Sequence, residues 1–445
     1  MKTKILSLLA ALLMCTCGWA QSIEGYWGGE LNVQGMKLGM FFNIVKTDSG
    51  FVSTLDVPQQ GASGIQVSTT TFDGFNIRME MAALHASYEG ILYEGYIGGT
   101  YSESGMKFPL TLRKTEKKPL LRPQEPKAPF PYKQEEVTFR NEREGITLAG
   151  TLTMPEGNGT CPAVVMISGS GPQNRDGELY GHKTFAVIAD FLTRNGIAVL
   201  RFDDRGVGAS ERGNTAATTL DLSYDAEAAV NFMKAKKCFS RIGVAGHSEG
   251  GLISFMLAER KMVDFVVSLA GPSVKGSEII VAQQDSISRI KGMSQELIVA
   301  NKKLFKDFFL IIDNSETIEG ARPQVESLAS ILPENARKEL MNQLLTPWMF
   351  YFCKYNPAKS IAATTCPVLV LNGTKDMQVI ASQNIPAYQK IISQNPEAKF
   401  EFHVLPNLNH LFQHCTTGDI SEYSQIEETI SPEVLELMKT FILSK

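Results

Sequence analysis

The chain has 445 residues, which at roughly 100–200 residues per domain predicts two or three domains. Hydrophobic residues make up 43% and charged residues 20%, with a net charge of −4, and this balance excludes a mainly disordered chain. No Lys/Arg-rich block occurs, which argues against nucleic acid or an anionic membrane surface as a partner. Beyond the extreme N-terminus no apolar run reaches the ~18 residues that a membrane span needs, so we expect a compact, soluble protein.

The first twenty residues have the pattern of an export signal. Lys2 and Lys4 precede an apolar stretch over residues 5–14, and Gly18-Trp19-Ala20 then offers small residues at a cleavage point. The pattern predicts a signal peptide over residues 1–20, and therefore export to the periplasm or out of the cell.

Two cysteines in this segment, Cys15 and Cys17, raise a lipoprotein as the alternative. The residues before them, Met14 and Thr16, fit poorly to the small residue usual before a lipidated cysteine. Five cysteines would remain after cleavage, and their scattered spacing contains no CxxC pair: Cys161, Cys238, Cys353, Cys366 and Cys415. Neither a zinc site nor a dense disulfide framework is indicated, although a single disulfide stays open.

Residues 21–113 are typical of an all-β domain. Short β-prone runs such as 40–45 and 51–55 alternate with turn signals at Asp73-Gly74, Glu89-Gly90 and Glu94-Gly95, which predicts a small sandwich or barrel. No cluster of acids, histidines or cysteines marks a site here, so we expect an accessory role. Residues 114–134 contain five prolines among charged residues and predict an extended interdomain linker.

From residue 135 to the C-terminus, predicted strands alternate with predicted helices. The run 163–167 is apolar throughout, as expected for a parallel strand buried on both faces. Helical periodicity follows over 185–192, and further strands are predicted at 198–202, 242–245 and 265–269. Repeated β-α-β units predict a parallel sheet with helices on both faces.

Between residues 272 and 354 the strands stop and the sequence becomes helical and charged. Strands resume at 368–371 and 400–404, and a last helix is predicted from Pro432. A helical insert at the carboxyl edge of a parallel sheet is well placed to be a lid over a ligand site, since ligands bind at that edge. The alternative is an insert with no functional role.

The segment Gly246-His247-Ser248-Glu249-Gly250 carries the strongest chemical signal. It follows a predicted strand and precedes a predicted helix, which is the context that gives Gly-x-Ser-x-Gly its meaning. The glycines permit a tight turn that exposes the hydroxyl of Ser248. The alternative is a plain strand-to-helix turn.

A serine hydroxyl needs a base that is held by an acid before it can act as a nucleophile. Asp376 and His410 each follow a predicted strand and come in the chain order Ser, Asp, His expected for this turn. The other candidates fit less well: His403 lies inside a strand, His414 lies farther from a strand end, His247 cannot easily reach its neighbour's hydroxyl, His85 belongs to the β domain, and Asp203 and Asp204 precede the serine. We therefore assign Ser248, Asp376 and His410 as the catalytic residues.

Two backbone N–H groups are needed for an oxyanion that forms in such a site. One is expected from Glu249, which follows the nucleophile, and the other from Ser170 in the small-residue loop 168–172, with Gly171 as the alternative. The loop lacks the Gly-Lys-Ser/Thr of a phosphate-binding P-loop, and the chain has no His-Glu-x-x-His zinc motif. No cofactor or metal is expected.

Together, the segments 168–171, Arg201-Phe-Asp-Asp-Arg-Gly-Val-Gly-Ala-Ser210, 246–250, Asn372-Gly-Thr-Lys-Asp376 and Asn409-His410 resemble the α/β-hydrolase superfamily. The chain is most similar to secreted bacterial esterases of the EstD type, near the serine aminopeptidase-like branch. The resemblance covers about 135–445, and the β domain with its linker is also similar to that subgroup. It implies an eight-stranded, mostly parallel sheet and ester hydrolysis through an acyl-enzyme. Ser168 departs from the His that often begins the oxyanion loop.

The sequence thus predicts a carboxylesterase that acts on a small-molecule ester. A peptidase with the same triad is the first alternative, and an aminopeptidase would need carboxylates near the acyl pocket to hold the substrate's ammonium group. Asp313, Glu316 and Glu319 in the insert are candidates for that role. A non-catalytic binding protein is the second alternative.

Overall fold

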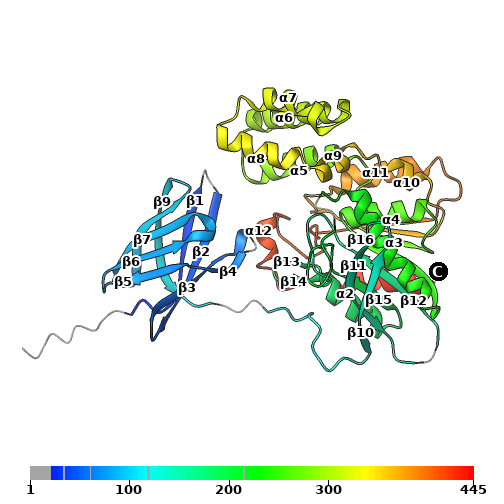
Figure 1. Ribbon diagram of the computed structural model, residues 1–445, viewed down its shortest axis with the longest axis horizontal. Coiled ribbons are helices and arrows are strands. Elements are labelled where there is room, and N and C mark those ends of the chain that lie inside the picture. Colours follow the sequence, from blue (N-terminus) through cyan, green and yellow to red (C-terminus); the bar gives the residue numbers. More distant parts are fainter. Residues whose placement is uncertain are drawn as a thin grey trace, which may run out of the picture. The chain divides into compact units, whose positions relative to one another are not determined.

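The computed structural model describes residues 22–33, 36–60, 62–117, 121–157, 159–213 and 216–444 (Figure 1). The predicted signal peptide lies outside the described residues. The chain divides into two compact units, Met1–Pro119 and Leu120–Lys445. No helix in the described ranges has the length and apolar character to cross a membrane.

The first unit is an antiparallel barrel. Its strands are β1 (Gly25–Val33), β2 (Met36–Thr47), β3 (Gly50–Val57), β4 (Ala62–Gln66), β5 (Thr69–Phe72), β6 (Asn76–Met81), β7 (Ala86–Tyr93), β8 (Tyr96–Glu103) and β9 (Met106–Thr115), with short 3-10 turns at Pro58–Gln60 and Ala82–Leu84. The order β2-β1-β9-β8-β7-β6-β5-β3 closes into a ring because β2 also pairs with β3, and β4 adds to β3 outside the ring. Alternate residues such as Phe42, Tyr88 and Leu112 fill one apolar core. Of the two predicted β architectures, the barrel is the one observed.

The second unit is built on an eight-stranded sheet of order β10-β11-β15-β12-β16-β17-β18-β19. The strands are β10 (Lys133–Asn141), β11 (Ile146–Met154), β12 (Cys161–Ile167), β15 (Ala198–Phe202), β16 (Phe239–His247), β17 (Val266–Leu269), β18 (Val368–Gly373) and β19 (Phe400–Leu405). β11 pairs antiparallel with β10 on one side and with β15 on the other. All pairings from β15 to β19 are parallel. The predicted α/β fold with a mostly parallel eight-stranded sheet is confirmed.

Helices cover both faces of this sheet because the side chains of each strand alternate between the two faces. In β12, Val165 and Ile167 belong to one apolar core, and Val164 and Met166 belong to another. The first core contains residues of α3 (Thr219–Ala235), α4 (Glu249–Glu259) and α11 (Ala381–Ile392). The second contains residues of α2 (Thr184–Arg194) and α13 (Pro432–Ser444). An uninterrupted apolar strand is therefore what this position in the sheet requires.

Six helices lie between β17 and β18, and the first five of them form the insert, which Figure 1 shows stacked beside the sheet and its covering helices. They are α5 (Gly276–Ile290), α6 (Gln295–Asn314), α7 (Ile318–Ala329), α8 (Glu334–Leu344) and α9 (Pro347–Lys354). They share a core of their own that includes Phe308, Ile312 and Val325. The remaining elements of this unit are short: β13 (Glu178–Leu179), β14 (His182–Lys183), α10 (Ala358–Ala362) and α12 (Ile420–Tyr423).

Candidate active site

Ser248 lies in a strained turn between β16 and α4. Its backbone has φ 54° and ψ −120°, in the left-handed region that non-glycine residues rarely adopt. The flanking glycines explain how the turn closes: a Cβ on Gly246 would lie 2.0 Å from the carbonyl oxygen of Gly250, and a Cβ on Gly250 would lie 2.2 Å from that of Ile167. The turn therefore accepts no larger residue at either glycine, and it sets Ser248 at the N-terminus of α4. We call residues 246–250 the serine turn.

Asp376 and His410 meet at the carboxyl ends of β18 and β19. His410 Nδ1 lies 2.8 Å from Asp376 Oδ2, and both side chains are buried. Asn372 donates to the same oxygen at 3.1 Å, and the backbone N–H groups of Gln378 and Val379 donate to Asp376 Oδ1 at 2.8 and 2.9 Å. Because both carboxylate oxygens are occupied by donors, the orientation of Asp376 is fixed, and His410 is held by its Nδ1 with Nε2 left for another partner.

His247 links the serine turn to His410. Its Nε2 donates a hydrogen bond of 2.9 Å to the backbone carbonyl of His410, and the two rings lie 4.6 Å apart between centroids. Burial, with a further contribution from His410, lowers the pKa of His247 to about 3. The sequence indicated only that His247 cannot easily reach the hydroxyl of Ser248. Its place beside the serine does not show that its ring would donate to the His410 carbonyl.

Glu249 has a buried carboxyl that bonds to two separate elements. Thr219 of α3 and Trp348 of α9 both donate to its Oε1, at 2.6 and 2.8 Å. Oε2 is buried and has no hydrogen-bond partner among the described residues. Burial raises the pKa of the Glu249 carboxyl, and the side chains of Thr219, Trp348 and Ser170 oppose that rise.

The loop 168–172 lies against the serine turn. A Cβ on Gly169 would come within 3.1 Å of the Ser248 Cβ. Asp204, at the end of β15, holds this loop: Ser168 Oγ donates to Asp204 Oδ1 at 2.5 Å and the Gln173 N–H donates to Oδ2 at 2.9 Å. Burial raises the pKa of Asp204 to about 7. The sequence argued against Asp204 as the catalytic acid because it precedes the serine. In the structure it anchors the loop 168–172 instead.

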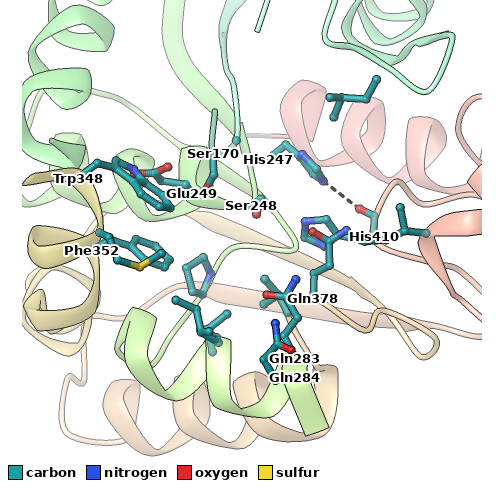
Figure 2. A pocket seen from close by; sticks show the side chains of 18 of the residues that line it. Ser170, His247, Ser248, Glu249, Gln283, Gln284, Trp348, Phe352, Gln378 and His410 are labelled. Atoms are coloured by element: carbon teal, nitrogen blue, oxygen red, sulfur yellow. Dashed lines mark hydrogen bonds between the residues drawn. The ribbon is translucent and has the colours of Figure 1, made fainter. Parts of the chain in front are cut away.

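Ser248 and His410 line one cavity of about 450 Å³ (Figure 2). Its walls come from the sheet edge and from the insert, with α5, α8 and α9 contributing most of the apolar side chains. The apolar lining consists of Leu179, Pro272, Ile279, Ile280, Phe305, Leu340, Leu344, Trp348, Met349, Phe352, Val379, Leu411 and Ile420. Gln173, Gln283, Gln284, Gln343 and Gln378 add uncharged polar groups. The insert thus covers this cavity, in the arrangement expected of a lid.

Of the other candidates, His247 lines this cavity, whereas His403, His414 and Asp203 do not. His403 pairs with Glu401 at 2.8 Å and His414 with Glu428 at 2.9 Å, and neither lines the cavity. Asp203 pairs with Arg175 at 2.7 Å. Of the two residues considered for the second oxyanion donor, Ser170 lines the cavity that contains Ser248, whereas Gly171 lines a neighbouring one. In the described ranges no cluster of three or more His, Cys, Asp or Glu could hold a metal ion.

Comparisons with known proteins agree with this architecture. A family model described as serine aminopeptidase, S33 matches residues 181–321. Esterase EstD of Thermotoga maritima is 27% identical over 288 residues, which cover 64% of this chain and 61% of the relative, so the chain spans less than two thirds of that protein's length. An uncharacterized 31.7 kDa protein of Escherichia coli is 24% identical over 268 residues, 59% of this chain and 88% of its own.

Solved structures with a similar course of the chain include two esterases. Esterase Pf2001 of Pyrococcus furiosus has a TM-score of 0.43 at 17% identity, over 70% of this chain and 90% of its own. Est1E of Butyrivibrio proteoclasticus has a TM-score of 0.41 at 16% identity, over 69% of this chain and 98% of its own.

The mostly parallel sheet and the serine turn after β16 have the arrangement typical of the α/β-hydrolase fold, and the partial family match is consistent with that arrangement. The chain is similar to the serine aminopeptidase S33 family over residues 181–321 and distantly related to esterase EstD.

Proposed function

We propose that this protein is a serine carboxylesterase that hydrolyses small esters through an acyl-enzyme. The observation that carries the proposal is the shared cavity: Ser248, on a strained turn, and His410, anchored by Asp376, line the same apolar pocket. Figure 2 shows the two side chains close together in the pocket wall.

In the proposed reaction, His410 Nε2 takes the proton of the Ser248 hydroxyl while its oxygen attacks the ester carbonyl. Asp376 holds the imidazole in the tautomer with hydrogen on Nδ1 and stabilises the imidazolium that forms. His410 then protonates the departing alcohol. A water molecule, activated by the same imidazole, attacks the acyl group and releases the acid and Ser248. No cofactor enters these steps.

The tetrahedral intermediate carries a negative charge that needs donors. The backbone N–H of Glu249, at the N-terminus of α4, is one, because the first N–H groups of a helix have no partner within the helix. The N–H of Ser170 is the other, on the loop that packs against Ser248. Losing one such donor typically costs about 3 kcal/mol of transition-state stabilisation.

The second candidate function is an aminopeptidase, which the family match at residues 181–321 favours. Such an enzyme needs a carboxylate to hold the substrate's ammonium group. Asp313, Glu316 and Glu319 do not line the cavity, and Asp313 faces Lys275 at 3.3 Å instead. Glu249 is the one acidic residue in the lining, and its carboxyl is buried and bound to Thr219 and Trp348. A pocket whose one acidic side chain in the lining is already bound to Thr219 and Trp348 supports an ester substrate over an ammonium-bearing one.

A substrate panel separates the candidates. We expect turnover of p-nitrophenyl acyl esters and labelling by a fluorophosphonate, both lost in Ser248→Ala, with Ser330→Ala on the insert surface as the matched control. Turnover of aminoacyl arylamides without turnover of esters would favour the peptidase. A folded protein that neither reacts with the fluorophosphonate nor turns over either substrate would favour a binding protein.

We also propose that the protein is exported after cleavage behind Ala20, on the strength of the charged and apolar pattern of residues 1–20. Intact mass of the protein from a bacterial host that secretes it should correspond to a chain that begins at Gln21. A lipidated or uncleaved N-terminus would contradict this proposal.

A further inference from the structure

A second cavity of about 450 Å³ lies next to the one that contains Ser248. Its lining consists of Gly171, Pro172, Asp204, Arg205, Gly206, Arg212, Ala217, Leu222 and Trp348. Trp348 is the one residue that lines both cavities. The loop 168–172 contributes Gly169 and Ser170 to the first cavity, and Gly171 and Pro172 to the second. The indole of Trp348 and this loop therefore form the partition between the two spaces.

Trp348 is held in this position by two contacts, and the partner in the first of them is itself held by Thr219. Its Nε1 donates to Glu249 Oε1 at 2.8 Å, which ties α9 of the insert to the residue after Ser248. The same oxygen accepts from Thr219 of α3, so the carboxyl is fixed from a third element. The ring also stacks on Phe352, one helical turn away, at 5.3 Å between centroids and 8° between planes. A ring fixed by a hydrogen bond on its edge and a stack on its face has little freedom to swing aside.

The burial of Glu249 fits this holding role. Its side chain is 1% exposed, and one of its oxygens has no partner among the described residues, which is costly for a carboxylate and less so for a neutral acid. Burial raises the pKa of this carboxyl, which is the direction that favours the neutral form. A neutral acid keeps Oε1 as an acceptor for Trp348 without placing a negative charge in the apolar pocket.

We propose that Trp348 is a specificity-determining residue, the wall that limits how long a substrate chain the pocket accepts, and that Glu249 is the positioning residue that keeps this wall in place. The proposal rests on the esterase function and specifies its substrates: esters whose chain ends before Trp348. The second cavity is then an extension of the binding site that the indole separates from the first cavity and that joins it when the indole is removed.

The test compares kcat and KM for p-nitrophenyl esters with acyl chains of two to twelve carbons. In Trp348→Ala we expect the preferred length to move up by several carbons, with about a fourfold gain in relative kcat/KM for each methylene that becomes buried. Trp348→Phe keeps an aromatic ring but loses the hydrogen bond to Glu249, so it should shift the length preference less than Trp348→Ala does. Phe350→Ala, on the same helix but in neither lining, controls for a general loosening of α9.

Glu249 is tested with the same panel. Glu249→Leu removes the acceptor of Trp348 and should broaden the length preference towards that of Trp348→Ala. Glu249→Gln keeps an acceptor oxygen and should restore the narrow preference. If Trp348→Ala does not fold, Trp348→Val can replace it, because it removes less side-chain volume. The preferred acyl chain length is measured in the same way.

The failures are distinguishable. A wild-type protein without ester turnover would refute the esterase function itself. An active wild type, together with a folded Trp348→Ala whose length preference is unchanged, would refute the role of Trp348 alone. A Glu249→Leu variant that keeps the narrow preference would refute the positioning role of Glu249.

Discussion

His247 and His410 are joined by a hydrogen bond of 2.9 Å from the ring of one to the backbone carbonyl of the other. The bond connects the serine turn directly to the loop after β19. This bond fixes the position of the His410 backbone relative to the serine turn. The bond to Asp376 fixes the orientation of the His410 ring. Two separate contacts thus determine where the proposed base lies.

We predict that His247→Phe lowers both the free energy of unfolding and kcat. The carbonyl of His410 loses its donor, and a buried unsatisfied carbonyl costs about 1–3 kcal/mol of unfolding free energy. We expect kcat for p-nitrophenyl acetate to fall about tenfold, because a displacement of about 1 Å in a catalytic group has effects up to about a hundredfold. His247→Gln, which keeps an N–H donor, should retain more of both. Equal losses in the two variants would show that the hydrogen bond does not matter.

The same histidine predicts a pH dependence of stability. Its pKa is about 3 in the folded protein, below the ordinary value of 6.5, so the unfolded chain binds the extra proton between these two values. The contribution of His247 to stability is therefore complete above about pH 6.5 and is lost as the pH falls towards 3. Denaturant titrations at pH 7, 6, 5 and 4 should show a shallower decline for His247→Phe than for the wild type. Parallel declines would contradict the lowered pKa.

Asp376→Asn should remove most of the esterase activity with little change in the free energy of unfolding. The backbone N–H groups of Gln378 and Val379 require an acceptor at the Oδ1 position, so the amide nitrogen must take the place of Oδ2. There it faces the Nδ1 of His410 as a second donor and favours the wrong tautomer. We expect kcat to fall by about 10⁴, the scale of this substitution in serine hydrolases. Asp307→Asn, in an exposed ion pair with Lys303, is the matched control. A loss of less than tenfold would argue against Asp376 as the acid.

Asp204→Asn should stabilise the protein at neutral and higher pH. Burial raises the pKa of Asp204 from 3.8 to about 7, so the folded state takes up a proton that the unfolded state lacks between these values. The contribution of Asp204 to the free energy of unfolding therefore falls as the pH rises from about 4 to 7. Above pH 7 the protein carries the full cost of burying this charged carboxylate. The advantage of Asp204→Asn over the wild type should grow across that window. Asp204→Ala removes the anchor of the loop 168–172 and should lower kcat about tenfold, which the asparagine variant avoids. A stability difference that does not change with pH would contradict the prediction.

Gly250→Ala should strongly destabilise the protein. The added methyl group would lie 2.2 Å from the carbonyl oxygen of Ile167, a backbone atom of β12 that cannot move aside without disturbing the sheet. We expect a loss of more than about 3 kcal/mol of unfolding free energy, measured by denaturant titration. Gly159→Ala, where nothing lies within 4 Å of the new methyl group, should stay within about 0.5 kcal/mol of the wild type. A Gly250→Ala variant as stable as the wild type would show that the close approach to the Ile167 carbonyl does not restrict the residue at position 250.

Much of the fold follows from patterns of a few residues. The apolar run at 163–167 predicted a strand buried on both faces, and β12 has that environment. The predicted strand 198–202 coincides with β15, and the helix expected after Gly250 in fact begins at Glu249, directly after the serine. These predictions succeed because backbone hydrogen bonding and the periodicity of burial act over a few residues.

The sequence by itself also indicated which loops carry the candidate site, since the carboxyl ends of parallel strands share one edge of the sheet. It could not indicate which side chains of the insert line the pocket, or that Trp348 bonds to Glu249, 99 residues earlier in the chain. Nor could it place the ring of His247 against the His410 carbonyl, or Asp204 under the loop 168–172. Strand and helix formation depends on near neighbours in the chain, whereas these contacts depend on how distant elements pack, and only the folded structure determines that.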